Sequence, residues 1–135
     1  MDGCTYFATW RLSRSQQGLQ PDERSLVSKV MKHFDGMRYR LFAYVVMDDH
    51  VHVLTTPLEG LSLQGIIHSW KSYSANRLQR DFGRCGRIWQ HRYTDRIIRD
   101  ERELTEKARY ILNNPVKRWP EIEEYEWVGF EESRY

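Results

Sequence analysis

The sequence has few cysteines and no long apolar run, and both shortages narrow its class. Only Cys4 and Cys85 are cysteines among 135 residues, and they do not form a C-x-x-C pair. Two isolated thiols argue against a disulfide framework or a zinc knuckle and are typical of a reducing compartment. No stretch is apolar enough to cross a bilayer, and the N-terminus has neither the basic nor the apolar region of an export signal. We therefore expect a cytoplasmic protein without membrane contact.

Low-complexity segments, internal repeats and evident linkers are also absent. The composition is 40% hydrophobic, 13% aromatic and 30% charged, which is typical of a folded protein rather than a disordered one. A chain of this length can bury about 65 to 70% of its unfolded surface, so one core suffices. We expect a single domain over residues 1–135 with an acidic C-terminal tail at about 119–135.

The chain carries little net charge, yet its charges are unevenly distributed along the sequence. The net charge is only +2, but residues 71–99 hold eight basic and two acidic residues, whereas residues 119–135 hold six glutamates and one arginine. Such asymmetry indicates a side that binds polyanions, although a solvated basic helix face explains the charge equally well. The opposite charges also allow the tail to cover the basic stretch.

The pattern of apolar residues predicts seven secondary-structure elements. Runs of aromatic and β-branched residues favour strands, and apolar residues at every third or fourth position favour helices. The expected elements are a strand over 4–12, a helix from Pro21 to Gly36, strands over 41–47 and 50–56 joined by a turn at Asp48 and Asp49, a helix over 62–82, a strand over 93–99, and a helix from Asp100 to near Pro115. This order predicts an α+β fold, a ferredoxin-like β-α-β-β-α-β arrangement with an additional C-terminal helix.

Two histidines, His50 and His52, alternate in the second strand of the predicted hairpin. Because side chains alternate faces along a strand, both imidazoles point the same way while Val51 faces the core. The pair is half of a metal site, and two solvated histidines are the alternative. Leu54 at the third alternating position argues against a histidine-triad phosphohydrolase, and the helix content argues against a cupin barrel.

The last predicted helix carries a tyrosine away from its apolar face. Its apolar residues from Leu104 to Leu112 cluster on one side, and Tyr110 lies roughly 140° from the centre of that cluster. Asn114 lies one turn further along the side of Tyr110, so a hydroxyl and an amide oxygen can approach one ion together. Asn113 is a competing choice, and a half-buried tyrosine without a function is the alternative for Tyr110.

Three segments, taken in sequence order, carry a family resemblance. Residues 45–54 (VVMDDHVHVL) resemble the histidine strand of the single-tyrosine HUH transposases, and above all of the REP-associated tyrosine transposases. Residues 89–101 (WQHRYTDRIIRDE) resemble the next block of that family, and residues 108–116 (ARYILNNPV) resemble its nucleophile segment. Three blocks in order are far more specific than a histidine pair alone.

The resemblance implies a metal-dependent transposase that cleaves and rejoins single-stranded DNA at hairpin-associated sites. It implies Tyr110 as the nucleophile, which would form a covalent 5′-phosphotyrosine. It implies His50 and His52 as ligands of Mg²⁺ or Mn²⁺, with Asn114 as the third ligand. The expected partner is single-stranded DNA that contains a hairpin, and a homodimer is one expected assembly.

The chain departs from the family pattern immediately before the first histidine. The family often has Pro-Asn at the two positions where this chain has Asp48 and Asp49. Aspartate is a common turn former, so we favour a turn role for Asp48 over a role as an additional carboxylate ligand.

The basic stretch supplies the expected DNA contacts. Arginines and lysines would bind phosphates, and aromatic rings would stack on bases. The residues expected to contact DNA are Lys71, Arg77, Arg80, Arg84, Arg87, Trp89 and Arg92. Core packing is the competing interpretation for Trp89. Two other functions remain open, a non-catalytic nucleic-acid-binding module of the same fold and a domesticated site-specific DNA nickase.

Overall fold

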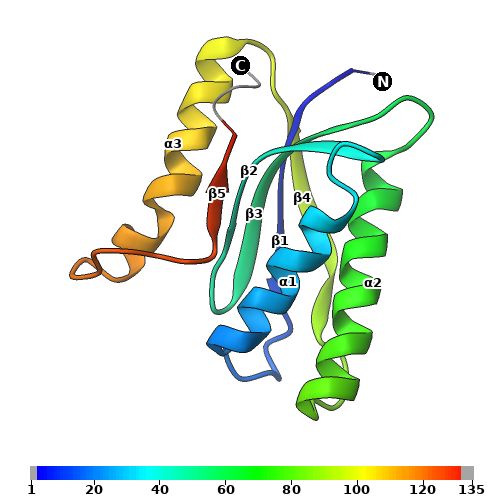
Figure 1. The fold of residues 1–135 in the computed structure, drawn as a ribbon, viewed down its shortest axis with the longest axis vertical. Helices are drawn as coiled ribbons and strands as arrows, with labels where there is room; N and C mark the ends of the chain where they lie inside the picture. The colour runs from blue at the N-terminus through cyan, green and yellow to red at the C-terminus, as the bar shows by residue number, and fades with distance from the viewer. Residues whose placement is uncertain (1–2, 132–135) are drawn as a thin grey trace.

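A computed structural model describes residues 3–131, which form an antiparallel sheet of five strands and three helices (Figure 1). The elements are β1 (Tyr6–Leu12), α1 (Pro21–His33), β2 (Tyr39–Val46), β3 (His50–Pro57), α2 (Leu63–Phe82), β4 (Trp89–Ile97), α3 (Glu101–Arg118) and β5 (Val128–Phe130). The strands lie in the order β4-β1-β3-β2-β5. The α+β class and the order of the seven predicted elements are confirmed. No helix within these residues combines the length and apolar character needed to span a membrane.

The helices cover the two faces of the sheet unequally (Figure 1). On one face α1 and α2 pack side by side over a large core, in which the Trp10 ring lies 5.7 Å from that of Trp70 and 6.2 Å from that of Trp89. On the other face α3 contacts β2, β3 and β5 over a smaller core that includes Ala108 and Ile111. Helix α3 therefore covers only the part of this sheet face near β5. Arg92, Thr94 and Arg96 of β4, at the opposite edge, are exposed.

Alternation along β3 places the histidines on the α3 face. Val51 and Val53 belong to the core under α1 and α2, whereas Leu54 belongs to the core under α3. His50 and His52 alternate with the valines and so share the face of Leu54. The predicted turn at Asp48 and Asp49 is present, because the Met47 N–H donates to the His50 carbonyl oxygen at 2.8 Å across it.

Several element boundaries differ from the predicted ones, and two of the differences affect the site. Strand β4 begins at Trp89 rather than Tyr93, because pairing with β1 continues to Leu12 past an irregularity in the register. Helix α3 continues past Pro115 to Arg118. Proline removes one helical hydrogen bond, but the Trp119 N–H donates to the Pro115 carbonyl oxygen at 2.7 Å and closes a last turn.

The acidic tail contains a short strand that the sequence did not predict. Strand β5 pairs with Ala43, Tyr44 and Val45 of β2. The indole N–H of Trp127 donates to the Ser25 hydroxyl oxygen of α1 at 2.9 Å, which fixes the segment before β5. The sheet order puts β5 and β4 at opposite edges. The described part of the tail therefore does not cover β4, contrary to the expectation from charge, and residues 132–135 lie outside the described residues.

Candidate active site

His50, His52 and Tyr110 come together between β3 and α3. The imidazole centroids of His50 and His52 are 4.6 Å apart, and the Tyr110 ring centroid lies 5.2 Å from that of His52. The two histidines are 8% and 4% exposed, whereas Tyr110 is 42% exposed. Two segments far apart in sequence therefore place an accessible phenol beside a buried pair of imidazoles.

Each imidazole has its Nδ1 atom engaged in a hydrogen bond. The Nδ1 of His50 lies 2.6 Å from Oδ1 of Asp49, and the Nδ1 of His52 lies 2.6 Å from the hydroxyl oxygen of Thr9. An ionised carboxylate only accepts hydrogen bonds, so His50 donates from Nδ1 and keeps the lone pair on Nε2. If His52 donates to Thr9 in the same way, both Nε2 atoms are free to bind an ion. Such outer hydrogen bonds orient metal-binding histidines.

Asn114 of α3 supplies the third polar group. Its Oδ1 lies 3.1 Å from Nε2 of His50, and the residue is 9% exposed, whereas Asn113 is exposed to solvent. With Nδ1 of His50 protonated, these two atoms are both acceptors, and a cation between them would satisfy both. Within residues 3–131 no group of three or more His, Cys, Asp or Glu could hold a metal. Two imidazoles and one amide oxygen are nonetheless a donor set that fits a divalent ion.

The surroundings keep His52 uncharged. Burial is the largest cause, and together with the electrostatic effect of His50, Arg11 and Lys107 it lowers the pKa of His52 to about 3. The neutral imidazole is the form that binds metal ions, so this site requires no deprotonation at neutral pH.

Asp49 is held in its ionised form. Burial raises the pKa of this carboxyl, but the hydrogen bond from His50 and the charges of His50, Arg118 and Arg11 lower it more. The pKa of Asp49 therefore lies below its usual value. The ionised carboxylate fixes the tautomer of His50. Asp48 and Asp49 thus belong to the turn and to the support of His50.

Three further residues at the site were not predicted from the sequence. The Phe7 ring stacks on His52 with centroids 5.4 Å apart, and Arg11 lies opposite His50 in the register of β1 and β3. The Nζ of Lys107 lies 5.1 Å from the Phe7 ring centroid and 5.9 Å from that of Tyr110. Two cations from different elements therefore flank the site, where they can hold a phosphate.

Two residues of the predicted DNA contacts are engaged in contacts within the protein. The Arg84 guanidinium forms a two-pronged ion pair with Glu23 and also donates to the Gln17 and Gly18 carbonyl oxygens. Trp89 is 4% exposed, and its indole N–H donates to the Ser74 hydroxyl oxygen at 2.9 Å. Arg84 is thus engaged in an ion pair and Trp89 is packed in the core, so contact with DNA stays a prediction for both.

The other predicted DNA contacts face several sides of the molecule. Lys71 donates to the Gln90 and His91 carbonyl oxygens and, with Arg87, lines a groove of about 710 Å³. Arg80 is near Asp81, at 3.1 Å, and its side chain is 71% exposed. Arg87 and Arg92 are exposed. The groove that Lys71 and Arg87 line does not include His50, His52 or Tyr110.

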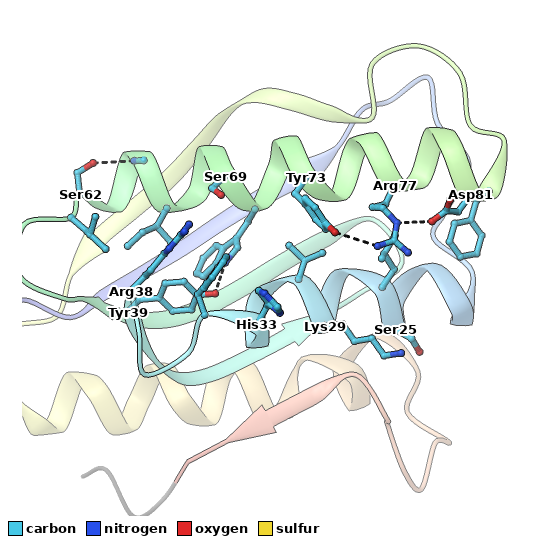
Figure 2. A pocket seen from close by; sticks show the side chains of 18 of the residues that line it. Ser25, Lys29, His33, Arg38, Tyr39, Ser62, Ser69, Tyr73, Arg77 and Asp81 are labelled. Carbon is cyan, nitrogen blue, oxygen red and sulfur yellow. Dashed lines mark hydrogen bonds and ion pairs between the residues drawn. The ribbon is translucent and has the colours of Figure 1, made fainter.

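Arg77 lies in a groove of about 910 Å³ between α1 and α2 (Figure 2). Its guanidinium pairs with Asp81 at 2.6 Å and lies close to the Tyr73 hydroxyl, on the wall that α2 forms. Neither His50 nor Tyr110 lines this groove, because it lies on the α1 and α2 side of the sheet. This groove between α1 and α2 is therefore separate from the candidate active site.

The chain is similar to known transposases in sequence and in fold. A family model described as "Transposase IS200 like" matches residues 1–114. A solved structure of a REP-associated tyrosine transposase bound to a REP hairpin is 24% identical, with a TM-score of 0.73 over 88% of this chain and 70% of that chain. A putative transposase from Deinococcus radiodurans R1 is 22% identical, with a TM-score of 0.57 over 81% of this chain and 88% of that chain. Among curated proteins, none matches.

The two solved structures establish a likeness of fold, and the family model covers most of the sequence. It includes the histidine strand and extends through Asn114 of α3. The chain therefore belongs to the IS200-like transposase family.

Proposed function

We propose that the protein cleaves and rejoins single-stranded DNA through a covalent 5′-phosphotyrosine on Tyr110. The observation that carries the proposal is the exposed Tyr110 phenol, whose ring lies 5.2 Å from that of the buried His52. Membership of a transposase family supports it. A tyrosine beside two imidazoles that can hold a metal ion is an arrangement compatible with nucleophilic attack on a phosphodiester.

The proposed cofactor is Mg²⁺ or Mn²⁺, bound by Nε2 of His50, Nε2 of His52 and Oδ1 of Asn114. The mixed nitrogen and oxygen ligands suit Mn²⁺ well and also allow Mg²⁺. When bound, the ion would polarise the scissile phosphate and neutralise part of its charge. The Nδ1 contacts with Asp49 and Thr9 would orient the two imidazoles and leave Nε2 of each for this ion.

In the proposed reaction the Tyr110 hydroxyl oxygen attacks phosphorus and forms a new P–O bond. The bond from phosphorus to the 3′ oxygen breaks, and that oxygen takes up a proton and leaves as a free 3′-hydroxyl. The phenol proton passes to solvent, which reaches the 42% exposed side chain. A second 3′-hydroxyl can reverse these steps and join a new end without ATP, because the covalent link conserves the phosphodiester bond.

The proposed substrate is single-stranded at the cut, because a scissile phosphate needs a pliable backbone to approach a helix-borne phenol. Arg11 and Lys107 would hold phosphates on either side of Tyr110. We extend the proposal to hairpin DNA because a REP hairpin is bound to the relative of known structure. Within one chain His50, Asn114 and Tyr110 lie together, which supports a reaction in which Tyr110 serves its own histidines.

The test uses end-labelled hairpin DNA with a single-stranded flank, with Mn²⁺ or EDTA, on a denaturing gel. Wild type should form a covalent adduct in Mn²⁺ only, and Tyr110→Phe should form none. Tyr73→Phe is the matched control, because Tyr73 is 53% exposed on α2 at the other side of the sheet. No adduct with any hairpin, together with unchanged DNA affinity in His50→Ala, would favour a non-catalytic binding module.

A further inference from the structure

Helix α3 presents one more side chain to the histidine strand, at its last residue. The Arg118 guanidinium donates from Nη2 to Oδ2 of Asp48 at 3.0 Å, and its Nη1 lies 3.6 Å from Oδ1 of Asp49. That same Asp49 oxygen lies 2.6 Å from Nδ1 of His50, and Nε2 of His50 lies 3.1 Å from Oδ1 of Asn114. These contacts form a closed ring that leaves α3 at Arg118 and returns to it at Asn114.

We propose that Arg118 is a positioning residue that locks α3 to the turn between β2 and β3. The inference rests on the proposed function, because it concerns how the same site is assembled. This lock orients the His50 imidazole through Asp49. It also fixes the distance of Tyr110 from the histidine pair.

The spacing along α3 explains why one side chain can do both. Tyr110, Asn114 and Arg118 follow one another at intervals of four residues, so they lie on one side of the helix on successive turns. Apolar contacts of Ala108 and Ile111 hold the middle of α3 on the sheet, but such contacts do not fix small rotations or shifts. Directed ion pairs at the helix end remove that freedom.

The turn also depends on Arg118. Asp48 and Asp49 are adjacent carboxylates, and Oδ1 of Asp48 is buried without a hydrogen-bond partner among the described residues. Without the guanidinium the two carboxylates would repel each other, and Asp49 could turn away from His50. The imidazole would then lose the acceptor that fixes its tautomer.

The test compares Arg118→Gln with Lys117→Gln, which removes the same charge from the neighbouring exposed position. Mn²⁺ affinity is measured by calorimetry without DNA, and the single-turnover cleavage rate and hairpin affinity are measured separately. Arg118→Gln should weaken Mn²⁺ binding and slow cleavage about 10-fold, the usual cost of losing an outer-shell partner. Its hairpin affinity should stay within about 2-fold of wild type, and Lys117→Gln should bind Mn²⁺ like wild type.

Two further variants separate positioning from folding. Arg118→Lys keeps one ion pair and should lose less than Arg118→Gln, and adding Arg118→Gln to Asp49→Asn should cost little more, because both break the same ring. If Arg118→Gln does not fold, Arg118→Lys and the ¹⁵N shifts of the His50 ring decide. Wild-type Mn²⁺ affinity and His50 shifts in a folded variant would overturn the inference. If wild type forms the Tyr110 adduct in that case, the proposed function stands without the lock.

Discussion

Lys107 lies beside Tyr110 at the surface of the site. Its Nζ lies 5.9 Å from the Tyr110 ring centroid, and no described residue forms an ion pair with it, so its charge is available to a phosphate. Lys107→Gln should weaken binding of single-stranded DNA and reduce the slope of log affinity against log salt by about 0.7 to 0.9, the value of one phosphate contact.

Arg109→Gln is the control, because Arg109 is exposed on the same helix two residues further along. Binding is measured by fluorescence anisotropy at several salt concentrations. Equal slopes for Lys107→Gln and wild type would show that Lys107 does not contact the backbone.

The second prediction concerns how stability depends on pH in the metal-free protein. Because the pKa of His52 falls to about 3 in the folded state, the unfolded chain binds a proton more readily than the folded one between about pH 3 and 6.5. The contribution of neutral His52 is thus complete above about pH 6.5 and is lost as pH falls. The free energy of unfolding should rise with pH in this window by at most about 1.4 kcal/mol per pH unit from this residue.

Urea denaturation of wild type and His52→Gln at several pH values measures this contribution. The slope in the variant should be smaller than in wild type between about pH 4 and 6. Identical slopes in the two proteins would mean that His52 titrates normally when folded.

At this scale the sequence predicted the residues that local spacing reveals. His50 and His52 alternate on a strand, and Tyr110 and Asn114 lie one turn apart on a helix, so the pattern itself groups them. Thr9 and Lys107 join the site through the pairing of β1 with β3 and the docking of α3, which no local pattern encodes. Likewise, charge counting cannot tell that Arg84 is already paired with Glu23, 61 residues away in sequence.

At the scale of elements, the least expected part is β5. Three residues between Trp127 and Glu131 give too short a pattern to predict a strand, and only the edge of β2 defines it. The predicted end of α3 was also wrong, because proline usually ends a helix. Here the helix continues for one helical turn past Pro115 and brings Arg118 to the loop between β2 and β3.

Gly129 provides the test of β5. A Cβ atom at this position would overlap the Tyr44 ring on the neighbouring strand. Gly129→Ala should lower the free energy of unfolding by about 1 to 3 kcal/mol, as overpacking usually does. Gly18→Ala is the control, since its Cβ would meet Asp48 only at ordinary contact distances, the nearest being 3.5 Å. An unchanged urea midpoint in Gly129→Ala would contradict the pairing of β5 with β2.

At the scale of the whole molecule, the sheet separates two surfaces. One face carries the histidines beneath α3. The other carries the groove between α1 and α2 (Figure 2). The order of elements and the α+β class followed from apolar periodicity, because each buried face repeats along its own element. The sides of the molecule on which the arginines lie could not be predicted from this periodicity, because they depend on how α2 and β4 pack.

The central claim is that Tyr110 becomes covalently joined to DNA, and mass spectrometry of the adduct tests it most directly. Trypsin cleaves after Arg109 and Lys117, so Tyr110 is the single tyrosine of the peptide over residues 110–117. After incubation with hairpin DNA and Mn²⁺ and nuclease digestion, this peptide should carry a nucleotide through its tyrosine. A nucleotide on a peptide with another tyrosine, or no modified peptide despite cleaved DNA, would contradict the account.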